Sequence, residues 1–441
     1  MKTSKNYLLF WLSQAVSELG SMMTSYALII WSYTQTKSVM SVSLLTFFTF
    51  APKALVSIFI GNFIDKHSKK NIIMITDTVS ALCTLSVCLL LYTNRLSIYH
   101  IYIINIVLGF MEAIQSPASS VAIGIIVPKN KYEKISGLMS VSENLNTVLY
   151  PMLAAALMGF SSIEAVLLFD IGAFMFAIII MIFFIKIPEV QLEEDNEEKI
   201  FSGFKEGISY LKTNKGIFYI IIGMTLLNFF SRLSYENILS PMILARSNNS
   251  EFTLGVVTSI IGLGGILGGL LVSTVKLPKN KVKMLFYSAA FSFLFGDLLM
   301  AFGQNVYFWS IAAVAASLPI PFTFAAQSVL IYNNVKTEIQ GRVFAVRNAM
   351  KFTAIPMGIL LGGAISEYVF EPFIHGGSNF AAFLLSLVGD TSGSGMAIMF
   401  ICTGILGSIS CLLLSNNKHI KNLMSNSRKE NQSSEFHVQS Y

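Results

Sequence analysis

The sequence predicts an all-α integral membrane protein with twelve transmembrane helices, arranged as two pseudo-symmetric bundles of six. Three observations support this prediction: few charged residues, a series of long apolar segments, and an uneven distribution of basic residues. Of the 441 residues, 54% are hydrophobic and 12% are charged, whereas an ordinary soluble domain has about 25% charged residues. This composition excludes a soluble enzyme and a disordered chain. The net charge of +6 is spread along the chain, so nucleic-acid binding is not expected.

The apolar segments reach the roughly 20 residues that a helix needs to cross the hydrocarbon core of a bilayer. They are too long and too uniformly apolar to be strands of a barrel. In chain order, the predicted spans are 8–30, 39–61, 72–92, 98–126, 135–160, 163–186, 216–238, 253–275, 283–303, 306–332, 342–369 and 394–415.

The basic residues predict the orientation of these spans. Only Lys37, Arg95 and Arg246 fall on the predicted outer side, while Lys53 and Arg232 lie within spans. All the other basic residues, Arg347 and Lys351 among them, are assigned to the side of the N-terminus. Because cytoplasmic connections are enriched in Lys and Arg, we expect both termini to be cytoplasmic.

A charged linker and an outer loop divide the chain. The predicted domains are an N-terminal six-helix bundle at 1–187, a cytoplasmic linker at 188–215, a C-terminal six-helix bundle at 216–415 and a cytoplasmic tail at 416–441. The outer loop, 370–393, contains an apolar piece, Phe380 to Val388, that is too short to cross. We expect it to lie in the membrane interface or to form a cap.

A weak internal repeat supports a duplicated architecture. Residues 135–141 align with 340–346 at an offset of 205 residues, and the same offset places Pro151 on Pro356. In both copies a basic loop enters a helix that contains a proline. Duplicated bundles are common in transporters, whose substrate site lies between the repeats.

The loop after the second predicted span contains Gly61, Asp65, Lys66, Lys69 and Lys70. The alternative to a special role is an ordinary basic loop on the cytoplasmic side. Their spacing resembles the signature Gly-x-x-x-Asp-Arg/Lys-x-x-Arg/Lys-Arg/Lys, which lies between the second and third helices of the major facilitator superfamily. The resemblance implies two bundles that rock about a central site, with this loop acting in the conformational change.

Further segments resemble the branch of this superfamily that contains macrolide-efflux proteins and the related siderophore exporters. They are residues 109–118, 150–154, 371–373 and 393–397. Two features depart from the pattern. The fourth span lacks the arginine that many drug–proton antiporters carry there, and Ala154 stands where a glycine is common.

Eight acidic residues lie within the predicted spans, where an ionised carboxylate is costly and should face a cavity, a partner or a proton. They are Glu18, Asp77, Glu112, Glu143, Asp170, Glu236, Asp297 and Glu367. Glu18 and Glu112 are the most central in their spans, whereas Asp77 and Asp170 lie nearer an edge. Gln14 shares a helical stripe with Glu18, and Gln115 lies close to Glu112. The helices that carry these stripes line the central cavity in the family that the chain resembles.

We therefore predict that Glu18 and Glu112 bind protons in a central cavity. A desolvated carboxyl can be neutral on the acidic outer side and release its proton inside. The alternative is a structural hydrogen bond to a neighbouring helix, which is favoured for Glu143. Lys53 needs a carboxylate partner such as Glu18. Arg232 and Glu236 are four residues apart, which predicts a structural or gating ion pair.

These features predict an exporter of hydrophobic or amphiphilic compounds that works by proton antiport and alternating access. By resemblance alone, a macrolide-like antibiotic is the first substrate to consider. The alternatives are a siderophore or small-metabolite exporter, or a uniporter of the same fold. No enzymatic or nucleotide-binding motif occurs, and no cofactor or metal is expected, since the proton gradient supplies the energy. We expect a monomeric transport unit in the cell membrane.

Overall fold

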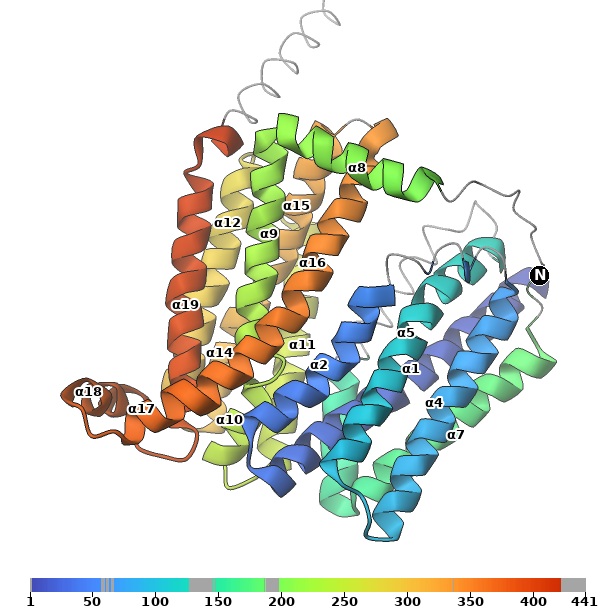
Figure 1. The fold of residues 1–441 in the computed structure, drawn as a ribbon, viewed down its shortest axis with the longest axis horizontal. Coiled ribbons are helices and arrows are strands. Elements are labelled where there is room, and N and C mark those ends of the chain that lie inside the picture. Colours follow the sequence, from blue (N-terminus) through green and yellow to red (C-terminus); the bar gives the residue numbers. More distant parts are fainter. Residues whose placement is uncertain are drawn as a thin grey trace, which may run out of the picture. The chain divides into compact units, whose positions relative to one another are not determined.

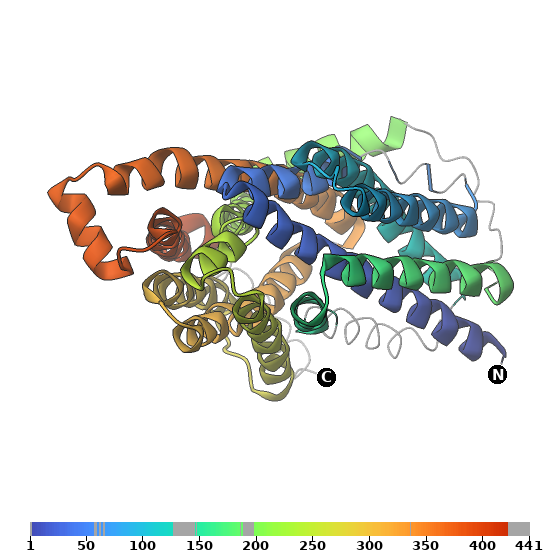
Figure 2. The ribbon, with the colours of Figure 1, turned by 90° about the horizontal axis from the view of Figure 1, so that it is seen from below.

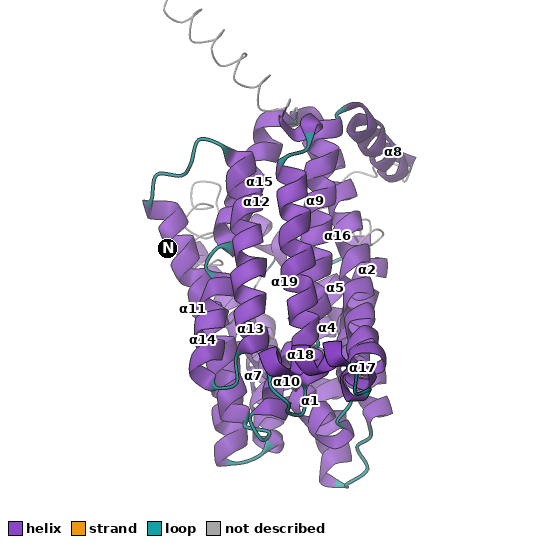
Figure 3. Ribbon diagram, turned by 90° about the vertical axis from the view of Figure 1, so that its left-hand side faces the viewer, coloured by secondary structure: helices purple, strands orange, loops and turns teal. Residues whose placement is uncertain are grey.

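A computed structural model describes residues 2–56, 60, 63–64, 67–126, 146, 148–185, 187, 198–335 and 337–421. Every secondary-structure element within these ranges is a helix (Figure 3), as the all-α prediction requires. Ten described helical stretches are long and apolar enough to cross a membrane. The predicted fold class is therefore confirmed, and the predicted count of twelve spans is consistent with the described helices.

The first half of the chain contains helices at the predicted spans. They are α1 (Lys2–Thr36), α2 (Val39–Val56), α4 (Lys69–Tyr92), α5 (Ile98–Ile126), an unlabelled helix (Val148–Phe160) and α7 (Ile163–Phe183). The predicted span 135–160 is described only at residue 146 and from residue 148 onward.

The second half contains helices at the remaining spans, several of them interrupted, and further helices in the predicted linker and outer loop. In order they are α8 (Glu198–Thr213), α9 (Lys215–Ser234), α10 (Leu239–Arg246), α11 (Glu251–Thr274), α12 (Lys281–Phe291), η2 (Ser292–Asp297), α13 (Leu298–Phe302), α14 (Val306–Ser317), α15 (Ile320–Asn334), α16 (Thr337–Ile365), η3 (Ser366–Phe370), α17 (Glu371–His375), α18 (Asn379–Val388) and α19 (Ser394–Ser415). The predicted span 306–332 is broken at Pro319, because a proline lacks the amide hydrogen that a continuous helix needs. The short apolar piece of the outer loop forms α18, which packs on α17.

The helices group into two compact units that are not the two halves of the sequence. The first unit contains residues 1–194, 235–262 and 359–396, and the second contains 195–234, 263–358 and 397–441. Parts of α11 and α16, together with α10, thus belong to the same unit as the first six spans. The predicted domain boundaries, with a linker at 188–215 between two six-helix bundles, therefore stay a prediction.

In the first unit, the carboxylate of Asp170 joins three helices. It lies on α7 and is buried, and it accepts hydrogen bonds from Thr24 Oγ1 of α1 at 2.8 Å and from Thr84 Oγ1 of α4 at 2.9 Å. Figure 2 shows α7 (green) lying along α1 (dark blue), with which it packs extensively. Hydrogen bonds between side chains of neighbouring helices stabilise membrane bundles. Asp170 thus links α7 to α1 and α4, and it is buried although the sequence placed it near an edge of its span.

Helices α2 and α5 approach each other closely at Gly109 (Figure 1). A Cβ atom added at Gly109 would lie 2.5 Å from the carbonyl oxygen of Thr49 and 3.1 Å from the Pro52 ring. One turn away, Asn105 Nδ2 donates to the carbonyl oxygen of Leu45 at 3.4 Å. The absence of a side chain at Gly109 thus sets the distance between the two helices.

Polar contacts also join the start of α2 to the segments of the second half that belong to this unit. The carboxylate of Glu367 accepts hydrogen bonds from Ser38 Oγ at 2.8 Å and from the Met40 amide at 2.7 Å. Asn237 Nδ2 donates to Ser43 Oγ and to the carbonyl oxygen of Ile359, both at 2.7 Å. An acidic group at a helix N-terminus is stabilised by the free amides and the helix dipole.

The second unit is built around a hydrophobic core between α9, α12, α15, α16 and α19, which includes Met224, Phe286 and Ala326. The linker helix α8 packs on the start of α16, where Glu206 forms an ion pair with Arg342. Leu211 of α8 is buried in the same core. The predicted linker 188–215 therefore contains a docked helix.

We predict that Gly109→Ala will destabilise the protein by about 1 to 3 kcal/mol, the usual cost of overpacking. The matched control is Gly172→Ala in α7, where an added Cβ meets no atom within 4 Å. The control should be neutral or slightly stabilising, since alanine favours a helix over glycine by about 1 kcal/mol. The measurement is the midpoint of thermal unfolding in detergent. Equal midpoints for the two variants would contradict the close contact.

Candidate functional site

An ion pair within the membrane-spanning part of the first unit joins α2 to α5. Lys53 Nζ lies 2.5 Å from Glu112 Oε2 and 4.8 Å from the centre of the Phe50 ring. The Lys53 side chain is 19% exposed and that of Glu112 is 60% exposed. Glu112 follows Gly109 by one turn, so the close approach of the two helices brings the charges together. Lys53 has the carboxylate partner that the sequence requires, but this partner is Glu112 and not Glu18.

Glu18 lies in a different polar cluster of the same unit. Its Oε2 accepts a hydrogen bond from Asn146 Nδ2 at 3.3 Å, and Asn146 also donates to the carbonyl oxygen of Ala15 at 3.3 Å. Glu18 itself is exposed on α1. Its contact with Asn146 fits the structural alternative that the sequence left open for this residue.

A third cluster joins α1, α4 and α5 through two amides and a carboxylate. Gln115 Nε2 donates to Asp77 Oδ1 at 2.6 Å and to Gln14 Oε1 at 3.4 Å. Asp77 is fully buried, and its Oδ2 has no hydrogen-bond partner among the described residues. Gln115 thus contacts Asp77, although its position in the sequence placed it close to Glu112. Sequence reasoning undervalued Asp77, because it assumed that water reaches a residue near the edge of a span.

The remaining predicted site residues lie elsewhere in the described chain or outside it. Helix α9 ends at Ser234, two residues before Glu236, and the ion pair between Arg232 and Glu236 stays a prediction. Lys69 is buried, and Lys70 Nζ donates to the carbonyl oxygen of Ile185 at 2.8 Å, just beyond the end of α7. Glu143, Gly61, Asp65 and Lys66 lie outside the described residues.

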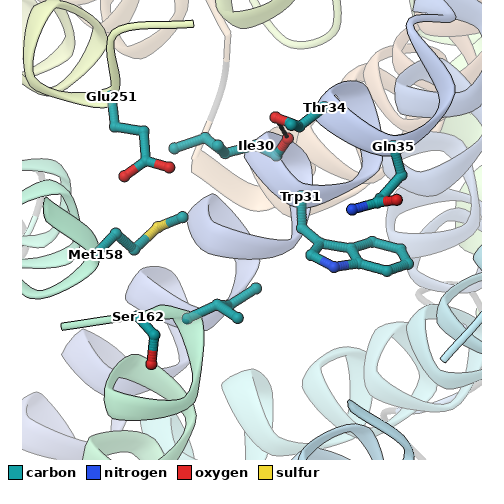
Figure 4. Close-up of a pocket in the computed structure, with 8 residues that line it drawn as sticks. Ile30, Trp31, Thr34, Gln35, Met158, Ser162 and Glu251 are labelled. Carbon is teal, nitrogen blue, oxygen red and sulfur yellow. Dashed lines mark hydrogen bonds between the residues drawn. The ribbon is translucent and has the colours of Figure 1, made fainter. Parts of the chain in front are cut away.

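The first unit contains a cavity of about 180 Å³ that the sequence did not reveal. Figure 4 shows the Glu251 carboxylate and the Met158 thioether near Ile30, with the Trp31 indole beside Gln35. A lining that combines one acidic side chain with polar and apolar ones can hold an amphiphilic compound.

The second unit contains a cavity of about 170 Å³ between α9, α15 and α16. Its lining includes two cations, Arg347 and Lys351, in the interior of α16. The sequence had assigned both to the basic side of the membrane. Within the described ranges, no group of three or more His, Cys, Asp or Glu residues is placed to hold a metal ion.

Comparison with known proteins identifies relatives over most of the chain. The profile of the Major Facilitator Superfamily matches residues 10–359. Macrolide efflux protein A of Streptococcus pyogenes is 24% identical over 366 residues, which cover 81% of this chain and 89% of the relative. The putative bacilysin exporter BacE of Bacillus subtilis is 27% identical over 194 residues, which cover 43% of this chain and 47% of the relative.

Solved structures share the fold at low sequence identity. The nucleoside transporter NupG superposes with a TM-score of 0.67 at 14% identity, covering 93% of this chain and 99% of the other. A bacterial homologue of the iron transporter ferroportin, in an inward-facing state, superposes with a TM-score of 0.68 at 12% identity. It covers 94% of this chain and 99% of its own. These similarities concern the fold alone.

We predict that Lys53→Met and Glu112→Gln, introduced singly, will each lower the thermal unfolding midpoint in detergent. Either change leaves the opposite charge without its partner in a membrane-spanning helix, which is costly. The double variant, which has neither charge, should be more stable than the sum of the single effects predicts. We expect a coupling of about 1 kcal/mol, because Glu112 is partly exposed. Strictly additive effects would show that the two side chains do not interact.

Proposed function

Because the chain belongs to the Major Facilitator Superfamily, we propose that it is a secondary transporter that exports hydrophobic or amphiphilic compounds in exchange for protons. It is a multi-pass membrane transporter and not an enzyme. The observation that carries the export proposal is the similarity to Macrolide efflux protein A, which extends over 81% of this chain and 89% of the relative. A macrolide-like antibiotic is therefore the first substrate class to test.

The Lys53–Glu112 pair is the best-supported candidate for proton coupling. While Glu112 is ionised, the pair is neutral overall and links α2 to α5. When Glu112 takes up a proton, Lys53 loses its partner and the link weakens. A proton that is bound in one conformation and released in another couples its gradient to the change of conformation.

Asp77 is the second candidate for the proton site, because its buried carboxylate has one oxygen without a partner among the described residues. Desolvation opposes the charged form of such a group. Protonated Asp77 would keep its hydrogen bond from Gln115, so the cluster can exist in both states. Glu18 is the weaker candidate, because its hydrogen bond from Asn146 fits a structural role.

The distribution of basic residues supports a position in the cell membrane with both termini in the cytoplasm. The proposed transport unit is a single chain. The energy source in this proposal is the proton gradient, and no bound cofactor takes part.

Accumulation of a labelled macrolide in a drug-sensitive host tests both the export and the coupling. Cells that express the wild-type protein should accumulate less label than cells with an empty vector, and a protonophore should remove the difference. Glu112→Gln should accumulate label like the empty vector, because it cannot exchange a proton. The matched control is Glu164→Gln, the same change in the first turn of α7, which should behave like wild type.

Asp77→Asn separates the two candidates for the proton site. If Glu112 binds the coupling proton, Asp77→Asn keeps export that the protonophore abolishes. Loss of export in Asp77→Asn, with normal export in Glu112→Gln, would move the proton site to Asp77. Wild-type accumulation equal to that of the empty vector, with and without a proton gradient, would refute macrolide export.

A second candidate function is export of another small metabolite, and it is supported by the similarity to the putative bacilysin exporter over 194 residues. A siderophore would be another cargo of this kind, and a uniporter would need no proton gradient. Protonophore-sensitive export of such a metabolite, together with macrolide accumulation equal to that of the empty vector, would favour this alternative.

A further inference from the structure

The cavity of the second unit is lined by residues from three helices. These are Met224, Thr225 and Asn228 of α9, Phe324, Gln327 and Ser328 of α15, and Arg347 and Lys351 of α16. Residues three and four apart lie on the same face of a helix. Each helix therefore turns one continuous face to the cavity.

Positive charge is concentrated at this cavity. Arg347 and Lys351 are one helical turn apart, and both line it. Arg232, one turn beyond Asn228 on α9, is a third cation whose charge acts on Lys351, as does that of Arg347. Arg347 and Lys351 are like charges that repel each other, and binding of an anion between them would relieve this repulsion.

Within the described part of the chain, neither Arg347 nor Lys351 forms an ion pair with a carboxylate. Arg347 is held in place differently, since its guanidinium lies 4.7 Å from the centre of the Phe344 ring and donates to Asn348 Oδ1 at 3.0 Å. Its orientation is thus fixed without a carboxylate partner among the described residues. By contrast, Lys53 and Arg342 each have a glutamate partner.

We infer that this cavity is a subsite for the anionic group, a carboxylate or a phosphate, of the compound that the protein exports. The inference rests on the proposed export function and deepens it by specifying the charge of the substrate. Arginine binds carboxylates and phosphates through two parallel hydrogen bonds, and lysine adds a compact positive charge. The amides of Asn228 and Gln327 can donate to the remaining oxygens.

The size of the cavity fits a head group and not a whole compound. Its volume is about 170 Å³, whereas pockets for drug-sized ligands reach about 300 to 1,000 Å³. Met224 and Phe324, which also line the cavity, offer apolar contacts to the part of the compound next to its charge. This inference therefore favours an amphiphilic anion over a macrolide-like antibiotic as the exported compound.

Three fluorescent probes that differ only in charge test this inference: 1-pyrenebutyrate, its neutral amide and 1-pyrenebutylamine. Each is titrated against the full-length protein in phosphatidylcholine nanodiscs, and binding is followed by fluorescence anisotropy. The wild-type protein should bind the carboxylate about tenfold more tightly than the amide, because a charge-assisted hydrogen bond is worth about that factor. The amine should bind most weakly.

Variants of two residues that line the cavity test whether the cavity causes the preference for the carboxylate. Arg347→Gln and Lys351→Gln should each reduce the preference for the carboxylate and leave affinity for the amide unchanged. Arg347→Lys, which keeps the charge, should retain most of the preference and so exclude misfolding as the cause. The matched control is Arg342→Gln, which removes a cation of the same helix that pairs with Glu206 and lies outside the cavity lining. It should bind all three probes like wild type.

Equal affinity for the carboxylate and the amide in the wild-type protein would overturn the inference, as would a full preference in Lys351→Gln. Repeating the titration in nanodiscs that contain phosphatidylglycerol separates two sources of the anion. A preference that anionic lipid abolishes would assign the cavity to a lipid head group and refute the substrate assignment. The binding experiment does not depend on transport. Macrolide export by a protein that binds the carboxylate and the amide equally would refute this inference alone. Preference for the carboxylate in a protein that does not export macrolides would refute only the macrolide proposal.

Discussion

The cost of leaving a charge or a polar group without a partner in the hydrocarbon region is the constraint on which this structure depends. The first unit meets it in several ways. Asp170 accepts bonds from two threonine hydroxyls, Asp77 receives one from a glutamine amide, and Glu112 pairs with Lys53. Each solution joins at least two helices. The groups that are most expensive to bury therefore also determine which helices pack together.

The two kinds of solution have different consequences. A carboxylate bound by hydroxyls and amides keeps its contacts when it is protonated, so it can hold helices together in either state. An ion pair keeps its strength only while both groups are charged. The hydrogen bonds of Asp170 are thus permanent links between helices, because they persist after protonation. The Lys53–Glu112 pair is a conditional link, because it holds only while both groups are charged. Conditional links are what a transporter needs at the places where its packing changes.

Much of the fold could be predicted from the sequence, because hydrophobic length and basic asymmetry are local properties. The sequence also indicated that Lys53 needs a carboxylate, since an isolated ammonium at that depth is unstable. It could not identify Glu112 as the partner, because that depends on how closely α2 and α5 approach at Gly109. Asp77 was undervalued for a similar reason: burial depends on the neighbouring helices and not on the distance to the end of a span. Arg347 and Lys351 were also misplaced by the sequence. The count of basic residues assigned them to the cytoplasmic side, whereas in the structure they line a cavity.

The boundaries between the two compact units fall inside secondary structure as well as in connections. One lies between Gly262 and Leu263 within α11, another between Gly358 and Ile359 within α16, and a third between Ser234 and Tyr235 at the end of α9. A boundary in a loop would let the units slide freely, but a helix transmits force along its axis. Pro356, just before the boundary in α16, removes one backbone hydrogen bond there, so α16 bends more easily at this point than an uninterrupted helix does.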